Sequence, residues 1–441
     1  MLAYLLVSIK AIDMKVGILG AGPVGRSFGE VLLKYGHEVY AFDINPDRTK
    51  GLPGGVYACG CEEEVGAESD LFLGCTDMFS GYALTKAAKA MPQDAVFCED
   101  FSAKAPAQRA FENAYRKDLA YWSIHTLFAP PPMNKPVDGS FKGKNIVEIP
   151  ASGCWRDDGT ERPQIAELRR ILEAEGAEFN VIYTIEDHDR RMGRVQGATS
   201  AENICTARTL AGLGINPLRE GSIYANGPDR VNFLMALRAI GEKGSSNPCV
   251  YGGIATMNPF ALRDIIEYSA TLESLLKASP EEAADMLRMA VGTLGRGRIE
   301  GALARWRNRF EKDFGPSGAG SNSGSSHLAE GLLWSQSDYP MDMFDVVTAP
   351  PYKMRGMLAL IGLADYERCL GNMLRGGTHD KDFLRTVGMY SELAEKAAKA
   401  KSVDSVVEFE KTFFTPVREE FPDDIKDINK KTNDLIAKMR D

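Results

Sequence analysis

Short apolar runs alternate with helix-like stretches through the first 185 residues of the chain. The runs predict strands, and the stretches between them, such as Ser80–Met91, Ala105–Lys117 and Glu161–Gly176, predict helices. This rhythm favours an α/β fold with a doubly wound parallel sheet and helices on both faces. The predicted strands are Lys15–Leu19, His37–Phe42, Asp70–Cys75, Asp94–Cys98, Leu119–His125, Asn145–Ile149 and Phe179–Tyr183.

The pattern changes after Thr184, where strand-like runs give way to helical ones. Thr184 and Asp187 have the spacing of a capping box, and the segment Ile185–Leu213 contains neither proline nor an evident turn. The later periodic segments predict an all-helical C-terminal domain. They are Arg230–Ile240, Pro259–Ser279, Pro280–Arg296, Glu300–Phe314, His327–Ser335, Tyr352–Gly362, Asp365–Arg375, Lys381–Ala400 and Val403–Lys411.

The sequence therefore divides into an extension, 1–13, an α/β domain, 14–184, and a helical domain, 185–441, for substrate binding and dimerisation. Within the helical domain, residues 315–326 are almost entirely Gly, Ser and Asn. Such residues bury little apolar area, so they predict a flexible loop. The final segment, 423–441, is predicted to be a charged amphipathic helix.

A glycine-rich turn joins the first predicted strand to the helix Arg26–Tyr35. Its G-x-G-x-x-G spacing, placed between a strand and a helix, is typical of a dinucleotide-binding Rossmann fold. The first glycine permits a tight turn, the second lets a pyrophosphate approach the backbone, and the third lets the helix pack closely on the strand. The helix N-terminus adds free N–H groups and a positive dipole. The turn consists of Gly20, Ala21, Gly22, Pro23, Val24 and Gly25.

Asp43 follows the second predicted strand, where an acidic residue accepts the ribose hydroxyls of an adenosine. A carboxylate there repels a 2′-phosphate, so the sequence favours NAD over NADP as cofactor. Arg48 lies close by in the sequence and can compensate a phosphate, which leaves NADP open. The alternative is an ordinary glycine-rich turn without a ligand.

Composition excludes several other classes. The formal net charge of −9 provides no basic footprint for nucleic acid or an anionic membrane. The opening apolar run, Met1–Val7, is too short to span a membrane and lacks the charged start of a signal peptide. Eight scattered cysteines without zinc-site spacing favour a reducing cytoplasm. The acidic run 186–189 cannot converge on an ion, because successive helical side chains point roughly 100° apart, so we expect no metal.

His125 ends the predicted strand Leu119–His125, and a loop containing the prolines 130–132 follows. In a parallel sheet, ligands bind at the edge formed by the carboxyl ends of the strands. Dehydrogenation of an alcohol needs a base to take the hydroxyl proton, and a neutral imidazole suits pH 7. His125 is therefore the candidate general base. The alternative is a histidine that only satisfies the loop backbone.

Three polar residues follow other predicted strands at the same edge. Ser102 and Lys104 come after Asp94–Cys98, and Thr76 comes after Asp70–Cys75. Ser102 and Lys104 are candidates to hydrogen-bond the cofactor or the substrate, and Thr76 is a candidate neighbour of the nicotinamide ribose. Each can equally serve to cap its loop.

From Met14 onward, the chain resembles the prephenate dehydrogenase family, in particular its long fungal-type members. In the first half the resemblance rests on the glycine-rich turn, on Phe101–Lys104 and on Ser123–Pro130, which is similar to the family's histidine loop. Further segments carry the resemblance through the second half. They are Glu186–Asp189, Val195–Thr199, Gly252–Pro259, Ser326–Leu328 and Thr378–Phe383.

The resemblance implies an NAD(P)-dependent oxidoreductase of tyrosine biosynthesis. The implied reaction is the oxidative decarboxylation of prephenate to 4-hydroxyphenylpyruvate. His125 would receive the hydroxyl proton, and Ser102 would bridge the hydroxyl and the nicotinamide. Ring aromatisation supplies the driving force, so the protein mainly positions substrate and cofactor and removes one proton.

The chain also departs from the family's pattern. Family members commonly carry a second histidine shortly after their His-Asp pair, and Ser200 stands there in this chain. A serine cannot carry charge, so we expect a weaker grip on a substrate carboxylate. The family also clamps a carboxylate with an arginine of the helical domain. Arg238 and Arg355 are the candidates for this role.

These departures leave arogenate or another amino-substituted cyclohexadienyl compound open as the substrate. From a different class, a non-catalytic NAD-binding regulator would keep the fold, but it would have no reason to keep His125 and Ser102. A 3-hydroxyacid dehydrogenase normally uses a lysine on the long helix of its helical domain, and Ile185–Leu213 contains none. We expect a homodimer, because two-fold dimers are the commonest soluble assembly.

Overall fold

The chain divides into two compact units, Met1–His188 and Asp189–Asp441, and the division falls within helix α7 (Ile185–Met192). The boundary predicted after Thr184 lies at the start of the same helix. The predicted loop 315–326 and the terminal helix 423–441 lie outside the described residues. The computed structural model describes residues 12–50, 52–127, 137, 139–214, 234, 236–237, 248–301, 303–304, 332, 335, 359–360, 362–367, 370–371, 392–393 and 410–421.

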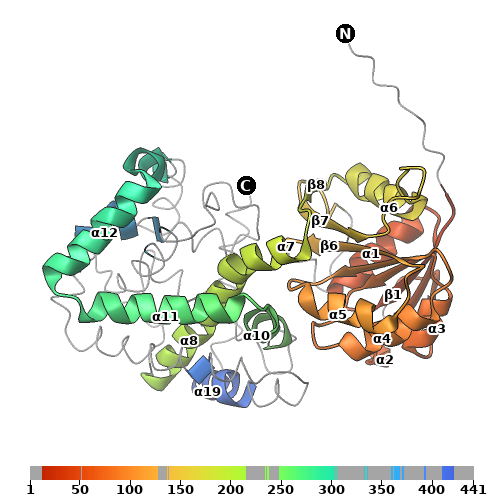
Figure 1. The fold of residues 1–441 in the computed structure, drawn as a ribbon. Coiled ribbons are helices and arrows are strands. Elements are labelled where there is room, and N and C mark those ends of the chain that lie inside the picture. Colours follow the sequence, from red (N-terminus) through yellow and green to blue (C-terminus); the bar gives the residue numbers. More distant parts are fainter. Residues whose placement is uncertain are drawn as a thin grey trace, which may run out of the picture. The chain divides into compact units, whose positions relative to one another are not determined.

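The first unit is built around an eight-stranded sheet with the order β3-β2-β1-β4-β5-β6-β7-β8 (Figure 1). The strands from β1 to β6 are parallel, so their carboxyl ends share one edge of the sheet. The strands are β1 (Lys15–Leu19), β2 (Glu38–Phe42), β3 (Val56–Ala58), β4 (Leu71–Gly74), β5 (Val96–Asp100), β6 (Ala120–Thr126), β7 (Asn145–Ser152) and β8 (Glu178–Val181).

Helices cover both faces of this sheet, which confirms the predicted doubly wound α/β fold (Figure 1). On one face, α1 (Pro23–Lys34) and α6 (Pro163–Ala174) share a buried core with the sheet. On the other face lie α3 (Glu62–Ala67), α4 (Gly81–Ala90) and α5 (Ala105–Ala114). Strand side chains alternate between the two faces, and each side therefore buries its own apolar layer.

The sheet is mostly parallel, as predicted, and departs from that arrangement at one edge. β7 pairs antiparallel with β6, with Val147 opposite His125, and β8 is parallel to β7. A parallel return needs a long crossover, usually a helix. The described residues between Thr126 and Asn145 form turns instead. The sequence pattern also missed three short elements after β2, namely α2 (Pro46–Lys50), β3 and α3, because runs this short carry little periodicity.

The second unit is helical throughout its described residues, as predicted. The long segment after Thr184 is helical but contains a π-helical stretch in its middle. Side chains on several faces of α8 are buried. Ile204 and Leu210 of α8 and Phe414 of η3 belong to the hydrophobic core of the second unit. The elements are η1 (Gly193–Ala198), α8 (Thr199–Gly212), η2 (Pro248–Gly252), α10 (Gly253–Met257), α11 (Ala261–Lys277), α12 (Pro280–Leu294), η3 (Glu410–Phe414) and α19 (Thr415–Glu420).

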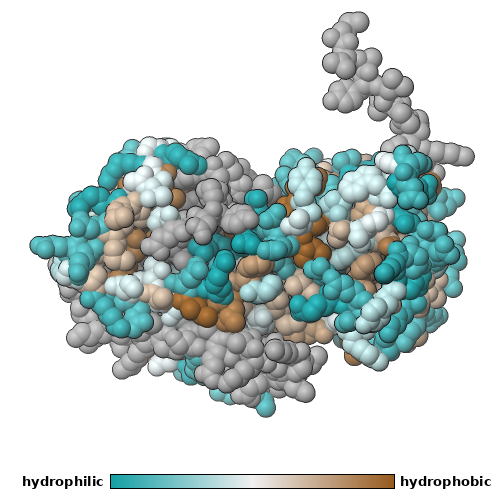
Figure 2. All heavy atoms as spheres, viewed as in Figure 1, coloured by the Kyte–Doolittle hydropathy of each residue, from teal (hydrophilic) through white to brown (hydrophobic). Residues whose placement is uncertain are grey.

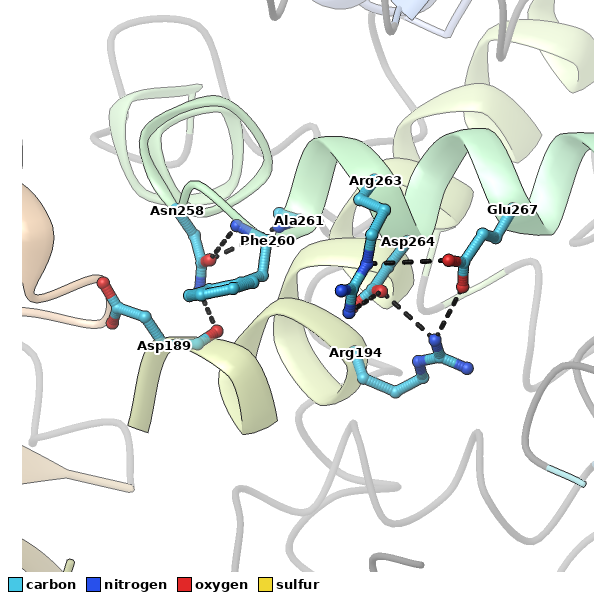
Figure 3. A network of polar contacts seen from close by, with 8 residues as sticks. All are labelled: Asp189, Arg194, Asn258, Phe260, Ala261, Arg263, Asp264 and Glu267. Carbon is cyan, nitrogen blue, oxygen red and sulfur yellow. Dashed lines mark hydrogen bonds and ion pairs between the residues drawn. The ribbon is translucent and has the colours of Figure 1, made fainter. Parts of the chain in front are cut away.

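The π-helical stretch η1 packs tightly against the start of α11. A Cβ atom on Gly197 would lie 2.4 Å from the Cβ of Ala261, so only glycine fits this approach. Figure 3 shows the polar contacts around the same packing: Arg194 lies 3.1 Å from Asp264 and 2.9 Å from Glu267. Asn258 lies between α10 and α11 and donates from Nδ2 to the backbone oxygen of Asp189 on α7 at 2.8 Å. The Arg194 contacts fix η1 on α11, and the Asn258 bond ties the start of α11 to α7.

The described surface is that of a charged protein with local apolar areas. Figure 2 shows hydrophilic residues over much of the viewed face and a hydrophobic band over α11. On α11 itself, Ile266 is 53% exposed. Among the described residues, no helix has the length and apolar character needed to cross a membrane.

Candidate active site

The glycine-rich turn between β1 and α1 has the geometry that its sequence predicts. Gly20 has a φ of +100°, and a Cβ there would lie 2.6 Å from the backbone oxygen of Cys75. A Cβ on Gly25 would lie 2.0 Å from the backbone oxygen of Gly20. At Gly22, no described atom lies within 4 Å of such a Cβ. The two outer glycines are therefore required by packing, while the backbone of Gly22 is open to a ligand.

Asp43 makes hydrogen bonds within the first unit that the sequence did not reveal. Its Oδ2 accepts a hydrogen bond from the backbone N–H of Ala21 at 2.9 Å, and its Oδ1 accepts from Asn45 at 2.8 Å. The carboxylate thus ties the glycine-rich turn to the loop after β2. A carboxylate has about four acceptor positions, so two remain for a ribose. Arg48 also lies beside this group, with Nη1 3.6 Å from Oδ2.

The register of the parallel strands brings the predicted site residues to one edge of the sheet. Gly74 at the end of β4 pairs with Glu99 of β5, and Asp100 pairs with Ile124 of β6. Thr76, Ser102 and His125 therefore lie at or just beyond neighbouring strand ends. Thr76 donates to the backbone oxygen of Asp77 at 3.1 Å, which is a loop-capping contact. Ser102 is partly exposed.

A buried polar cluster lies beneath this edge and is centred on Glu99. Both carboxylate oxygens accept hydrogen bonds, from Tyr121 at 3.2 Å, from the backbone N–H of Phe101 at 2.8 Å and from the hydroxyl of Ser123. The Nζ of Lys104 lies 3.2 Å from Glu99 Oε2 and also donates to the backbone oxygen of Ile124. Burial raises the pKa of Glu99, and the nearby ammonium and these hydrogen bonds oppose that rise.

Lys104 is thus engaged inside the first unit. Its side chain is fully buried, and its ammonium is shared between a carboxylate and a backbone oxygen. Direct contact between Lys104 and a substrate stays a prediction.

Asp100, which follows Glu99 at the end of β5, accepts hydrogen bonds from both the N–H and the hydroxyl of Thr126, at 2.7 and 2.6 Å. These bonds hold the end of β6 against β5 just beyond His125.

His125 is 3% exposed and pairs with a second histidine. Its Nδ1 lies 2.9 Å from Nε2 of His188, a residue 63 positions later, on α7. In the sequence, His188 belongs to a helix start and to the segment Glu186–Asp189 that carries the family resemblance, and nothing in its spacing indicates a partner so far away. The start itself is as expected: the hydroxyl of Thr184 accepts a hydrogen bond from the N–H of Asp187 at 3.0 Å.

Both imidazoles are held neutral. Burial lowers the pKa of His125 well below its ordinary value, and the neighbouring His188 and Lys104 lower it further. Burial and Lys104 likewise lower the pKa of His188 well below the ordinary value. A general base must be unprotonated to act, so these shifts keep His125 in the form that such a role would require at neutral pH.

In the helical unit, Ser200 lies on α8 and is completely buried. Its hydroxyl has no hydrogen-bond partner among the described residues, and the same holds for one side-chain oxygen each of Gln196, Asn203 and Thr206. Arg238 and Arg355 lie outside the described residues, so the carboxylate clamp stays a prediction. Within the described part of the chain, no group of three His, Cys, Asp or Glu side chains is arranged to hold a metal ion.

Comparison with known proteins gives distant relatives. No protein family model matches the chain. A Schizosaccharomyces pombe protein named "Probable prephenate dehydrogenase", with NADP(+) in its name, is 24% identical over 272 residues. That match covers 60% of this chain and 58% of the relative, so the chain matches little more than half of the relative's length.

Two solved structures are also similar. Prephenate dehydrogenase from A. aeolicus, in complex with hydroxyphenyl propionate and NAD+, is 20% identical with a TM-score of 0.49, covering 63% of this chain and 96% of its own. Arogenate dehydrogenase from Synechocystis is 17% identical with a TM-score of 0.39, covering 63% of this chain and 98% of its own.

Proposed function

We propose that this chain catalyses the NAD(P)+-dependent oxidative decarboxylation of prephenate to 4-hydroxyphenylpyruvate. The observation that carries the proposal is the environment of His125, a buried imidazole at the carboxyl edge of a sheet that also bears a dinucleotide-type turn. Nδ1 of this ring is bonded to His188, and Nε2 is the nitrogen that remains for a substrate. The S. pombe relative and the histidine-loop segment Ser123–Pro130 support prephenate as the substrate.

The proposed chemistry needs one proton acceptor and good positioning. The hydroxyl proton of the substrate passes to Nε2 of His125 as hydride leaves the same ring carbon. NAD(P)+ held over the glycine-rich turn would supply the acceptor for that hydride. Carbon dioxide then leaves, the electron pair of its bond makes the ring aromatic, and the proton returns to the phenolic oxygen. Ser102, partly exposed beyond β5, is proposed to donate a hydrogen bond to the reacting hydroxyl.

The cofactor is proposed to lie over the glycine-rich turn. The open backbone at Gly22 and the N-terminus of α1 would hold the pyrophosphate, and Asp43 would accept the ribose hydroxyls. Thr76 is proposed to lie beside the nicotinamide ribose. Because the Asp43 carboxylate repels a 2′-phosphate, we expect NAD+ to bind more tightly than NADP+, with Arg48 as the residue that favours NADP+.

Turnover is the direct test of this function. Purified full-length protein is mixed with NAD+ or NADP+ and either prephenate or arogenate, and the reduced nicotinamide is followed by its absorbance. Reduction with prephenate, accompanied by 4-hydroxyphenylpyruvate, is the expected result. If the nicotinamide is reduced with arogenate but not with prephenate, arogenate is the substrate. Cofactor binding without any turnover would indicate a non-catalytic NAD-binding protein.

Cofactor choice is tested by calorimetry on matched variants. Asp43→Asn keeps an oxygen that can accept from Ala21 but removes the charge, so the preference for NAD+ should narrow by about tenfold, or roughly 1.4 kcal/mol. Asp43→Ala should narrow or reverse it further. Arg48→Ala is the control, because it should weaken NADP+ alone. Equal affinities of the unaltered protein for NAD+ and NADP+ would contradict the proposal that the Asp43 carboxylate repels a 2′-phosphate.

A homodimer and a cytoplasmic location are part of the same proposal. The hydrophobic band over α11 offers apolar area for association (Figure 2). Light scattering coupled to size exclusion measures the assembly directly, and a mass near 48.2 kDa would contradict the dimer.

A further inference from the structure

His188 is the buried group that the proposed mechanism leaves unused, and it touches the proposed base. The two imidazoles are joined between Nδ1 of His125 and Nε2 of His188 at 2.9 Å. The rings meet edge to face, with centroids 5.1 Å apart and planes inclined at 63°. Neither residue is more than 3% exposed, so water competes little for this bond.

A hydrogen bond between two neutral imidazoles contains a single proton. If His125 donates from Nδ1, the Nε2 lone pair of His125 is free to accept a proton from a substrate. If His188 donates from Nε2 instead, His125 carries its hydrogen on Nε2 and cannot act as a base there. The direction of this one bond decides whether His125 can perform the proposed chemistry.

We propose that His188 is a positioning residue, which accepts the Nδ1 proton of His125 and thereby holds the basic lone pair of His125 on Nε2. This inference rests on the proposed function, because that function makes His125 the proton acceptor. The same bond fixes the rotation of the His125 ring. His188 acts only through His125 and touches neither substrate nor cofactor in this scheme.

The charged groups around the pair explain why a neutral acceptor suits this place. Lys104, at the start of α5, disfavours protonation of both rings, while Glu99 and Asp100 on β5 are committed to Lys104 and Thr126. On α7, Asp187 and Asp189 flank His188 in the chain. A carboxylate in place of His188 would also orient His125, but it would stabilise the imidazolium and raise the pKa of the base. Histidine orients the ring without adding that charge.

Matched substitutions at position 188 separate positioning from packing. His188→Leu removes the acceptor at similar volume, and kcat should fall by at least about 10–100-fold, the usual loss when a hydrogen-bond partner that orients a functional histidine is removed. His188→Gln places an amide oxygen near the former Nε2 and should retain most of kcat. KM for prephenate and NAD+ should change little in both. A folded His188→Leu protein with unaltered kcat, or equal losses in the two variants, would overturn the proposal.

Another buried histidine of the same unit provides the control. His37 accepts from the N–H of Met14 at 3.4 Å and faces Glu167 at 3.6 Å, away from the proposed site. His37→Gln should lower the melting temperature while kcat stays unchanged. If it lowers kcat as much as His188→Leu does, loss of a buried histidine explains both results and the proposal fails.

Nitrogen-15 NMR of the histidine side chains reads the tautomers without any turnover. The full chain has five histidines, so single substitutions assign the signals. With NAD+ bound, we expect His125 to carry its hydrogen on Nδ1. Hydrogen on Nε2 would overturn the positioning role even in a protein that oxidises prephenate. The expected tautomer in a protein that does not oxidise prephenate would support the bond and refute the proposed function.

Discussion

Each unit contains a group of buried polar side chains, and the two groups differ in how far their hydrogen bonds are satisfied. In the sheet unit, the donors Tyr121, Ser123 and Lys104 converge on Glu99, and His125 is bonded to His188. In the helical unit, a row along η1 and α8 buries oxygens of Gln196, Ser200, Asn203 and Thr206 that have no hydrogen-bond partner among the described residues.

This contrast has an energetic meaning. A buried polar atom without a partner costs about 1–3 kcal/mol, whereas a satisfied cluster holds its members in fixed positions. In the sheet unit, the His125 imidazole is therefore held in a fixed position by its bond to His188. The row on α8 keeps unused hydrogen-bonding capacity, which water or a ligand can take up.

Removal of the proposed base in the sheet unit should give the largest effect of all the substitutions, a loss of kcat. His125→Asn keeps an amide nitrogen near the position of Nδ1, so contact with His188 is retained while Nε2 is lost. We expect kcat to fall about 10²–10⁴-fold with little change in NAD+ affinity, the usual size of a general-base contribution. Steady-state kinetics and calorimetry measure both quantities. Turnover near that of the unaltered protein would show that the proton goes elsewhere.

Breaking the Glu99 cluster should have the next largest effect. Lys104→Met leaves a buried carboxylate without its cation, which typically costs about 3–5 kcal/mol of unfolding free energy. The matched change in the helical unit is Arg194→Met. It should cost less, because Asp264 keeps Arg263 at 3.3 Å. Urea unfolding measures both variants.

A second substitution tests the cause of that loss. Adding Glu99→Gln to Lys104→Met removes the unpaired charge and should recover much of the stability. Equal losses from Lys104→Met and Arg194→Met, or no recovery in the double variant, would contradict the idea that the sheet cluster is the more tightly coupled one.

The same cluster shows where sequence reasoning succeeds and where it stops. The strands and the glycine-rich turn were predictable because their patterns are local. The predicted strand ended at Cys98, since Glu99 and Asp100 are charged. In the structure β5 continues through both, because Lys104, Ser123 and Thr126 satisfy them.

Contacts between residues far apart in the sequence could not be predicted, because they leave no local pattern. The bond between His125 and His188 joins residues that share no local pattern, and the antiparallel direction of β7 leaves the alternation of its side chains unchanged. Lys104 was a candidate to bind a ligand because it follows the end of a strand, with loop capping as the alternative, and in the structure it pairs with a carboxylate five residues earlier. Such contacts depend on partners brought together by the fold.

Two completely buried serines provide a smaller and closely matched comparison. Ser123→Ala removes a donor from Glu99 and should cost about 1–3 kcal/mol. Ser200→Ala removes a completely buried hydroxyl with no partner among the described residues, so the unfolding free energy should stay the same or rise, by up to about 1–3 kcal/mol. If Ser200 contacts the substrate, its substitution should raise KM for prephenate instead.

A larger side chain at position 200 also tests whether Ser200 contacts the substrate. Ser200→His should lower KM for prephenate if the position faces the substrate, because a donor able to carry charge replaces a neutral hydroxyl. If the position only packs, overfilling should cost about 1–3 kcal/mol without any gain in affinity. Melting temperature and KM measured on the same protein distinguish the two. A destabilised protein with unaltered KM would place Ser200 away from the substrate.

The pH dependence of stability should differ in sign between the two buried histidines of the sheet unit and Asp264 of the helical unit. The pKa values of His125 and His188 lie well below the ordinary 6.5, so the unfolded chain binds protons that the folded chain does not. Stability from these groups is present above pH 6.5 and is lost as pH falls below it, by up to about 1.4 kcal/mol per pH unit for each histidine.

In the helical unit, burial raises the pKa of Asp264 above 3.8, so its contribution is lost as pH rises through that range. Unfolding free energies between pH 4 and 7 should therefore show a weaker fall at acid pH in His188→Gln, and the opposite change in Asp264→Asn. Because the lowered pKa keeps His125 unprotonated, the acid limb of kcat should also lie below pH 6.5. A limb at or above 6.5 would mean that the base in the enzyme–substrate complex is not this buried, neutral histidine.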